Sequence, residues 1–304
     1  MNRLPPYSSV EHKAESDATP EQDCCDGHGW TVTGIALVAI CAMSAVLFVA
    51  VFPPDEQKHT PNPITIVARG TSGGNETNVS GASAAVPLIL DLHGAGGTPE
   101  WSFAYTQMFA CANRNQWHIH YPAGYGNTWN AGPGMYEPAA SHSDHVREIE
   151  TIVLDLKRRL NVSRVFVTGV SNGCAMALRL GMESDVADVV ACKSHAMHSS
   201  IAPRNDSRVV PLMLLTADDD HIFASQESVA RTIDTYASTN ECGSGEYDIV
   251  STGNETDLTW RRAQNCSAPV EHLLYAGGGH MTTAASRSSE RMCAFFERVN
   301  RGLE

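Results

Sequence analysis

The sequence of 304 residues lacks several patterns that mark common classes of protein. Its 21 Lys and Arg residues are outnumbered by 34 Asp and Glu and form no basic block, so a nucleic-acid partner is not expected. No segment repeats at the period of a solenoid. Its glycine-rich loops are not followed by the Lys-Ser/Thr pair of a phosphate-binding loop, which argues against nucleotide binding.

Metal-ligating residue types occur in two short runs, but neither run has the pattern of a metal site. His118 and His120 alternate on a predicted strand at 117–121, and no third ligand lies near them in the sequence. We interpret them as one exposed strand face. From Asp218 to His221, adjacent side chains of an extended chain point in opposite directions and cannot surround one ion. We therefore predict no metal and no organic cofactor.

The first 85 residues divide into three segments of different composition. Residues 1–29 are polar and acidic, which predicts a disordered tail. Residues 30–52 are uncharged and almost wholly apolar, just long enough for one transmembrane helix. The long acidic leader and the prolines that follow favour an uncleaved anchor over a signal peptide. Residues 53–85 are expected to be a linker with a possible strand at Ile64 to Ala68, and residues 86–304 the catalytic domain.

Two features after the apolar segment indicate an oxidising compartment. Six Asn-x-Ser/Thr sequons begin at Asn75, Asn78, Asn161, Asn205, Asn254 and Asn265. Six cysteines also follow the segment, an even number that fits three disulfides: Cys111, Cys174, Cys192, Cys242, Cys266 and Cys293. We therefore expect a single-pass type II membrane protein whose C-terminal part faces the lumen or the outside.

A Gly-x-Ser-x-Gly pentapeptide lies where a predicted strand at 165–168 meets a helical stretch from Ala175. This arrangement predicts a nucleophile elbow, in which Ser171 sits on a tight turn at the end of a sheet. Gly169 and Gly173 are expected to be required because a Cβ at either position would collide with backbone, and because the turn demands φ values that side chains disfavour. The start of the helix would offer free N–H groups to an oxyanion.

A second glycine-rich stretch, residues 93–97, directly follows a predicted buried strand at 87–92. Small residues there let backbone N–H groups approach a substrate carbonyl. We expect the N–H groups of Ala95 and Asn172 to form an oxyanion hole, with Gly94 as the alternative to Ala95. A tight strand-to-helix turn with no catalytic use is the other interpretation.

Three ring side chains near these loops are candidate substrate contacts, namely His93, Trp101 and Trp129. Trp129 lies at the centre of a loop from Gly126 to Gly132. Loops at the carboxyl ends of parallel strands build the cleft in such sheets, so this indole is a candidate substrate platform. Packing as a loop anchor is an equal alternative.

An acid and a histidine follow the nucleophile in the sequence. Asp218 comes first after the predicted strand at 209–217, and we expect it to be the acid that orients the histidine, with Asp220 as the alternative. His280 ends a glycine-rich loop after a predicted strand at 270–275. Such a loop can bring the imidazole to both the serine and the acid.

The order serine, acid, histidine is that of the α/β-hydrolase fold. More narrowly, the chain from about residue 86 to its end resembles the secreted esterases grouped as polyhydroxybutyrate depolymerases and feruloyl esterases. The matching stretches are Asp91 to Trp101, Gly126 to Gly132, Gly169 to Gly173, Thr216 to Asp218 and Gly277 to His280. The resemblance implies a mostly parallel, doubly wound sheet and a carboxylic ester hydrolase that acts through an acyl-enzyme on a small or polymeric ester.

Departures from the family pattern lie at positions that border the cleft, so the resemblance leaves the substrate open. Residues 133–135 stand where family members carry paired cysteines, and residues 221–223 and 281–282 also differ. The resemblance further implies a disulfide between Cys242 and Cys266. It suggests another between Cys111 and Cys293, because this fold packs the helices that carry them on the same side of the sheet.

Two other functions use the same sequence features. The triad could pass the acyl group to a sugar or lipid acceptor instead of water. Alternatively, the domain could be a hydrolase-like ectodomain that only binds. Such ectodomains typically lose a member of the triad, whereas this chain keeps a serine, an acid and a histidine.

Overall fold

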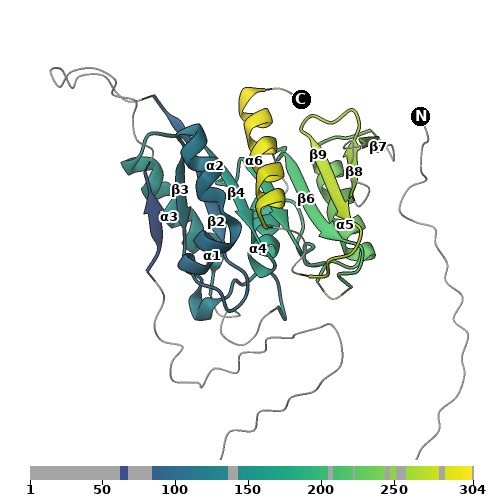
Figure 1. The fold of residues 1–304 in the computed structure, drawn as a ribbon, viewed down its shortest axis with the longest axis horizontal. Coiled ribbons are helices and arrows are strands. Elements are labelled where there is room, and N and C mark those ends of the chain that lie inside the picture. Colours follow the sequence, from purple (N-terminus) through teal and green to yellow (C-terminus); the bar gives the residue numbers. More distant parts are fainter. Residues whose placement is uncertain are drawn as a thin grey trace, which may run out of the picture.

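The computed structural model describes residues 62–67, 84–135, 143–204, 208–221, 223–243, 247–250, 258–280 and 285–302. They form a nine-stranded sheet with helices on both faces (Figure 1). The expected tail 1–29, the apolar segment 30–52 and most of the linker 53–85 lie outside the described residues. Within those residues, no helix combines the length and the apolar character needed to span a bilayer.

Across the sheet the strands follow the order β1-β3-β2-β4-β5-β6-β9-β8-β7. Six neighbouring strands from β3 to β9 run parallel, while β1 pairs antiparallel with β3, and β8 antiparallel with both β9 and β7. The strands are β1 (Ile64–Ile66), β2 (Val86–Leu92), β3 (His118–Tyr121), β4 (Val162–Gly169), β5 (Val189–Lys193), β6 (Leu212–Ala217), β7 (Tyr247–Val250), β8 (Leu258–Ala263) and β9 (Val270–Tyr275). The expected mostly parallel sheet is confirmed.

The apolar runs that predicted strands are those buried on both faces. In β2 every residue after Val86 is buried, and in β4 burial begins at Val165, as expected for central parallel strands. The strand β8 was not expected. Its sequence is polar because an antiparallel strand near a sheet edge needs only partial burial, and five of its six residues are half-buried.

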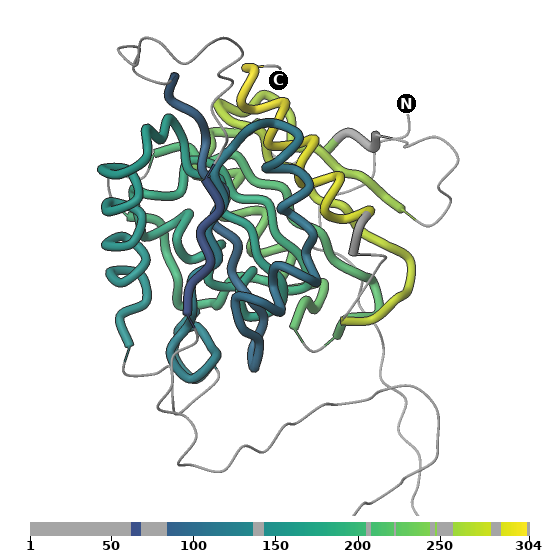
Figure 2. The backbone as a smooth tube through the Cα atoms, turned by 60° about the vertical axis from the view of Figure 1, so that its left-hand side comes forward, coloured from purple at the N-terminus to yellow at the C-terminus, as the bar shows by residue number. Residues whose placement is uncertain are grey.

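Helices cover the two faces in two groups, and each group has its own hydrophobic core. The helices α3, α4 and α5 lie on one face, and α1, α2 and α6 on the other (Figures 1 and 2). In chain order they are α1 (Pro99–Thr106), α2 (Met108–Asn115), α3 (His145–Arg159), α4 (Asn172–Glu183), α5 (Gln226–Thr239) and α6 (Ala285–Arg301), with a short 3₁₀ helix at Tyr125–Asn127. The helices α1 and α2 are separated at Gln107, whose φ of 56° ends α1.

Three disulfides connect distant parts of this domain. Cys111–Cys293 joins α2 to α6, and Cys242–Cys266 joins the end of α5 to the loop before β9, so both expected pairings are confirmed. The third bond, Cys174–Cys192, joins the first turn of α4 to β5. Three disulfides in one domain indicate an extracellular or lumenal location.

Candidate active site

Ser171 lies between the end of β4 and the start of α4, with φ 55° and ψ −125°. This conformation is unfavourable for a residue with a side chain and costs about 1–3 kcal/mol. A Cβ on Gly169 would lie 2.5 Å from the carbonyl carbon of Gly173, and a Cβ on Gly173 would lie 2.1 Å from the oxygen of Leu92. The expected collisions are therefore confirmed. The positive φ, however, falls on the serine and not on these two glycines.

His280 connects the serine to a carboxylate. Its Nε2 lies 2.8 Å from Oγ of Ser171, and its Nδ1 lies 2.8 Å from Oδ2 of Asp220. Burial alone would raise the pKa of Asp220, but the hydrogen bond and charge of His280 outweigh burial and lower it. An ionised carboxylate only accepts hydrogen bonds, so Nδ1 carries the proton and Nε2 can accept from the serine hydroxyl.

The expected contact between His280 and Asp218 is wrong, because the chain turns after β6. Asp218 still belongs to the pairing of β6 with β9, since its N–H donates to the carbonyl of Tyr275 at 3.0 Å. The chain then turns, with the N–H of Asp220 3.4 Å from the carbonyl of Ala217. This turn brings the third carboxylate of the run, Asp220, which was the alternative, to the imidazole.

The other two aspartates of this run hold the loop that carries the histidine. The N–H of Gly277 donates to Asp218 at 2.7 Å, and the N–H of Gly279 donates to Asp219 at 2.8 Å. Gly277, Gly278 and Gly279 have φ values of 75°, 107° and 63°, which side chains rarely adopt. Two carboxylates therefore hold the glycine loop that places His280 beside Ser171.

The glycine-rich loop after β2 runs beside the serine. A Cβ on Gly94 would lie 3.6 Å from the Cβ of Ser171. Within the loop, the N–H of Gly96 donates to the carbonyl of Asn127 at 2.8 Å. The N–H groups of Gly94, Ala95 and Asn172 donate to no acceptor in the part of the chain that the structure describes. They remain available to an oxygen atom bound at Ser171.

His93 is a buried support of this loop and not a surface group. Its Nδ1 lies 2.8 Å from the carbonyl of Gly94, and its Nε2 accepts from the N–H of Gly124 at 3.0 Å. Burial lowers the pKa of His93 to about 4, so the ring is neutral and Nδ1 carries its proton. With no exposed surface, His93 cannot contact a substrate, and that prediction is wrong.

Trp129 is likewise a loop anchor, which was the alternative to a substrate platform. It is 1% exposed, and its Nε1 donates to the carbonyl of His93 at 2.8 Å. Its backbone N–H donates to Oδ1 of Asn172 at 2.6 Å, and Nδ2 of Asn172 donates back to its carbonyl at 3.0 Å. Asn172 thus joins the elbow to this loop. The signal in the sequence was a polar residue followed directly by an apolar stretch, residues 173–178.

Two further aromatic side chains border the site. Trp101 is 36% exposed and stacks on Tyr105 with 4.5 Å between ring centroids. A Cβ on Gly97 would lie 3.2 Å from this indole, so Trp101 stands beside the glycine-rich loop. Phe223, which the sequence did not single out, packs against His280 with centroids 4.3 Å apart.

Comparison with known proteins supports the fold. No protein-family model matches the sequence, and no curated protein matches it. The acetyl xylan esterase from Aspergillus awamori superposes on 69% of this chain and 89% of its own, with a TM-score of 0.53 and 12% identity. The chain has the α/β-hydrolase fold. A carboxylesterase from Bacillus cereus is also similar, with 11% identity, 80% and 96% coverage and a TM-score of 0.49.

In the α/β-hydrolase fold, the nucleophile turn follows a central parallel strand and the acid and histidine come later in the chain. Here these positions are taken by Ser171 after β4, Asp220 after β6 and His280 after β9. Because all three strands are parallel, their carboxyl ends meet at one edge of the sheet.

The two histidines of β3 are not an exposed strand face, as the sequence suggested. His118 and His120 are 6% and 4% exposed, and Nδ1 of His120 lies 2.7 Å from the hydroxyl of Thr65 on β1. Burial lowers the pKa of His120 to about 4. Across the described part of this α/β-hydrolase domain, no group of three or more His, Cys, Asp or Glu side chains could hold a metal ion.

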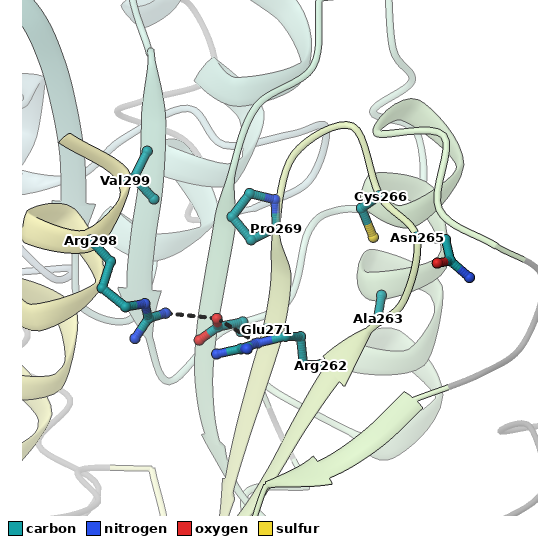
Figure 3. Close-up of a pocket in the computed structure, with 8 residues that line it drawn as sticks. All are labelled: Arg262, Ala263, Asn265, Cys266, Pro269, Glu271, Arg298 and Val299. Carbon is teal, nitrogen blue, oxygen red and sulfur yellow. Dashed lines mark hydrogen bonds and ion pairs between the residues drawn. The ribbon is translucent and has the colours of Figure 1, made fainter. Parts of the chain in front are cut away.

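A pocket between β8, β9 and α6 is lined by none of the candidate active-site residues Ser171, Asp220 and His280. Glu271 is 1% exposed and lies between Arg262 and Arg298, at 3.0 and 2.7 Å (Figure 3). Its other oxygen accepts from Nε1 of Trp260 at 3.1 Å. The pocket is lined by Arg262, Ala263, Asn265, Cys266, Pro269, Glu271, Arg298 and Val299. Its buried carboxylate is fully paired, so we assign this pocket a structural role.

Proposed function

We propose that the domain is a serine hydrolase of carboxylic esters. The observation that carries the proposal is the pair of 2.8 Å hydrogen bonds from Ser171 through His280 to Asp220. A serine hydroxyl is a weak nucleophile unless a base takes its proton, and a neutral imidazole held by a carboxylate is such a base. The unfavourable backbone of Ser171 supports the same role, because such conformations cluster at active sites.

In the proposed reaction, His280 removes the proton of Ser171 as the hydroxyl attacks the ester carbonyl. Asp220 stabilises the imidazolium that forms. The N–H of Asn172 and that of Ala95, or Gly94, hold the oxyanion. The imidazolium then protonates the leaving alcohol, and a water molecule activated by His280 releases the acid from the acyl-enzyme. No step uses a metal or an organic cofactor.

The substrate class rests on resemblance. The sequence motifs resemble those of polyhydroxybutyrate depolymerases and feruloyl esterases, and the fold is similar to that of an acetyl xylan esterase. We propose an ester substrate, small or polymeric, that contacts Trp101. Of the three expected contacts, Trp101 is exposed beside the glycine-rich loop, whereas His93 and Trp129 are buried.

We further propose a single-pass type II protein, with residues 30–52 as its anchor and the catalytic domain lumenal or extracellular. The three disulfides support an oxidising compartment. The two sequon asparagines among the described residues, Asn161 and Asn265, are both exposed. A glycosidase that removes N-glycans should increase the gel mobility of the protein expressed in its secretory pathway. Unchanged mobility would contradict this topology.

The activity is tested with short-acyl, feruloyl and 3-hydroxybutyrate esters offered to the protein and to Ser171→Ala. We expect wild type to hydrolyse at least one ester and the variant to lose at least 10³-fold in kcat, because the nucleophile is removed. Circular dichroism and thermal unfolding of both proteins control for folding. Equal and negligible rates on every ester, with both proteins folded, would leave a binding domain as the better interpretation.

A further inference from the structure

A buried polar cluster lies under the active site on the face covered by α1, α2 and α6. The catalytic steps above do not use it. All of its side chains are at most 6% exposed. Its members are Asp91, Ser102, Thr106, Lys193, Ser288 and Ser289.

Asp91 connects β2, which precedes the glycine-rich loop, to α1, which follows it. It lies on β2, two residues before the loop begins at His93. Its carboxylate accepts hydrogen bonds from Ser102 at 3.0 Å and from Thr106 at 2.5 Å, and both hydroxyls belong to α1, which follows the loop. Because charge-assisted hydrogen bonds are strong, this carboxylate limits how far the loop between β2 and α1 can move.

Lys193 joins the nucleophile turn to the same cluster. It is the last residue of β5, and its carbonyl accepts the N–H of Ser171 at 3.0 Å. Its ammonium donates to the hydroxyl of Ser288 on α6 at 3.1 Å. The ammonium also lies over the ring of Tyr105 on α1, 4.7 Å from the centroid. One residue therefore contacts the turn, α1 and the helix that follows the histidine loop.

A direct bond between the two helices closes the cluster. The hydroxyl of Ser289 on α6 donates to the carbonyl of Thr106 on α1. The helix α1 directly follows the glycine-rich loop, and α6 follows the loop that carries His280. The segments that carry the expected oxyanion N–H groups, the nucleophile and the base thus meet at one set of buried polar contacts.

The electrostatics of the pair agree with this geometry. Burial raises the pKa of Asp91 to about 7, against the hydrogen bonds of Thr106 and Ser102 and the charge of Lys193. Burial lowers the pKa of Lys193 to about 8, against the charge of Asp91. Each charge is costly in this environment without the other. Removing one charge should therefore make the burial of the other more costly and disturb the segments that the other side chain holds.

We propose that Asp91 and Lys193 are positioning residues, which hold the glycine-rich loop and the Ser171 turn in the geometry that stabilises the oxyanion. This inference rests on the proposed function. Neither side chain touches the reacting atoms. A displacement of about 1 Å at a catalytic group can cost on the order of 10²-fold in rate, so loss of either positioning residue should lower kcat.

The test compares Asp91→Asn and Lys193→Met with wild type in the full-length protein. Each variant keeps the size of the side chain and removes its charge. We expect kcat for ester hydrolysis to fall about 10²-fold with KM changed less than threefold. Affinity for a trifluoromethyl ketone, whose adduct carries an oxyanion, should fall by a similar factor. The rate at which a fluorophosphonate labels Ser171 should fall too.

Glu271→Gln is the matched control, because it also removes a buried charge from the domain but lies away from the loop and the turn. It should lower the stability and leave kcat, inhibitor affinity and labelling rate unchanged. Should Lys193→Met fail to fold, Ser288→Ala removes the acceptor of its ammonium and should give a smaller loss in the same three readouts.

Two results would overturn the inference, and they are distinguishable. If wild type is active while the Asp91 and Lys193 variants lose only stability, as Glu271→Gln does, the cluster is structural and the proposed function stands. A wild type that neither hydrolyses an ester nor reacts with the fluorophosphonate would overturn the proposed function together with the inference.

Discussion

Two buried carboxylates of this domain have different partners, and the partners determine what each carboxylate can do. Asp220 is 3% exposed and contacts His280, whose side chain is 25% exposed and also reaches the hydroxyl of Ser171. Glu271 is 1% exposed and lies between Arg262 and Arg298, which stay charged at any physiological pH. Burial of an acid is thus no sign of catalysis unless its partner is a base that reaches a nucleophile.

The largest expected effect separates Asp220 from its neighbour in the same turn. Asp220→Asn should lower kcat on a hydrolysed ester about 10⁴-fold, because the amide can no longer fix the histidine tautomer and stabilise the imidazolium. Asp218→Asn keeps an oxygen that can accept from Gly277, so its kcat should fall less than tenfold. Steady-state kinetics of both purified variants measure the difference. If Asp218→Asn lost more kcat than Asp220→Asn, Asp218 would be the catalytic acid instead.

The second prediction applies the same change to the structural carboxylate. Glu271→Gln leaves two guanidinium groups without a counter-charge, and breaking a buried ion pair in this way costs about 3 kcal/mol or more. Urea unfolding should show this loss in the free energy of unfolding, while kcat stays within twofold of wild type. Loss of kcat without loss of stability would mean that the Glu271 pocket belongs to the active site.

The third prediction extends the comparison to histidines. Burial lowers the pKa of His93, His120, His145 and His195 to about 4, and of His272 to about 3. The unfolded chain takes up these protons below about pH 6.5 and the folded chain does not. The unfolded state therefore binds more protons, and stability falls as the pH drops from 6.5 toward 4. Each histidine contributes up to about 1.4 kcal/mol per pH unit.

Asp91 acts in the opposite direction in the same range, because its raised pKa makes the folded state bind a proton near pH 7. As one group against five, it should reduce the slope without reversing it. Urea unfolding at half-unit pH steps measures the free energy of unfolding across this range. A stability that stays constant between pH 6.5 and 5 would contradict the burial of these rings.

Much of the fold could be predicted from the sequence because its central strands are buried on both faces. Apolar runs before His93 and before Gly169 predict buried parallel strands, which the structure contains as β2 and β4. The polar strand β8 was missed because it is only partly buried, and a partly buried strand has no apolar run that would predict it. The disulfides between Cys111 and Cys293 and between Cys242 and Cys266 followed from the resemblance to a known family.

The site was harder to predict wherever a side chain's direction mattered. Asp218 was preferred because it comes first after the strand, with Asp220 as the alternative, but the turn after Ala217 is what brings Asp220 to His280. Trp129 and His93 stand in the loops that build the site, yet their rings point into the protein and hydrogen-bond to backbone. Position along the chain identified the right loops, but the backbone turns within those loops were not visible in the pattern of residues.

The most direct measurement is the chemical identity of the residue that a fluorophosphonate modifies. After labelling and digestion, mass spectrometry should find the adduct on Ser171 in wild type, with labelling much slower in His280→Ala, because the imidazole that accepts the serine proton is 2.8 Å away. A folded wild-type protein that stays unlabelled, or that carries the adduct on another residue, would contradict the account.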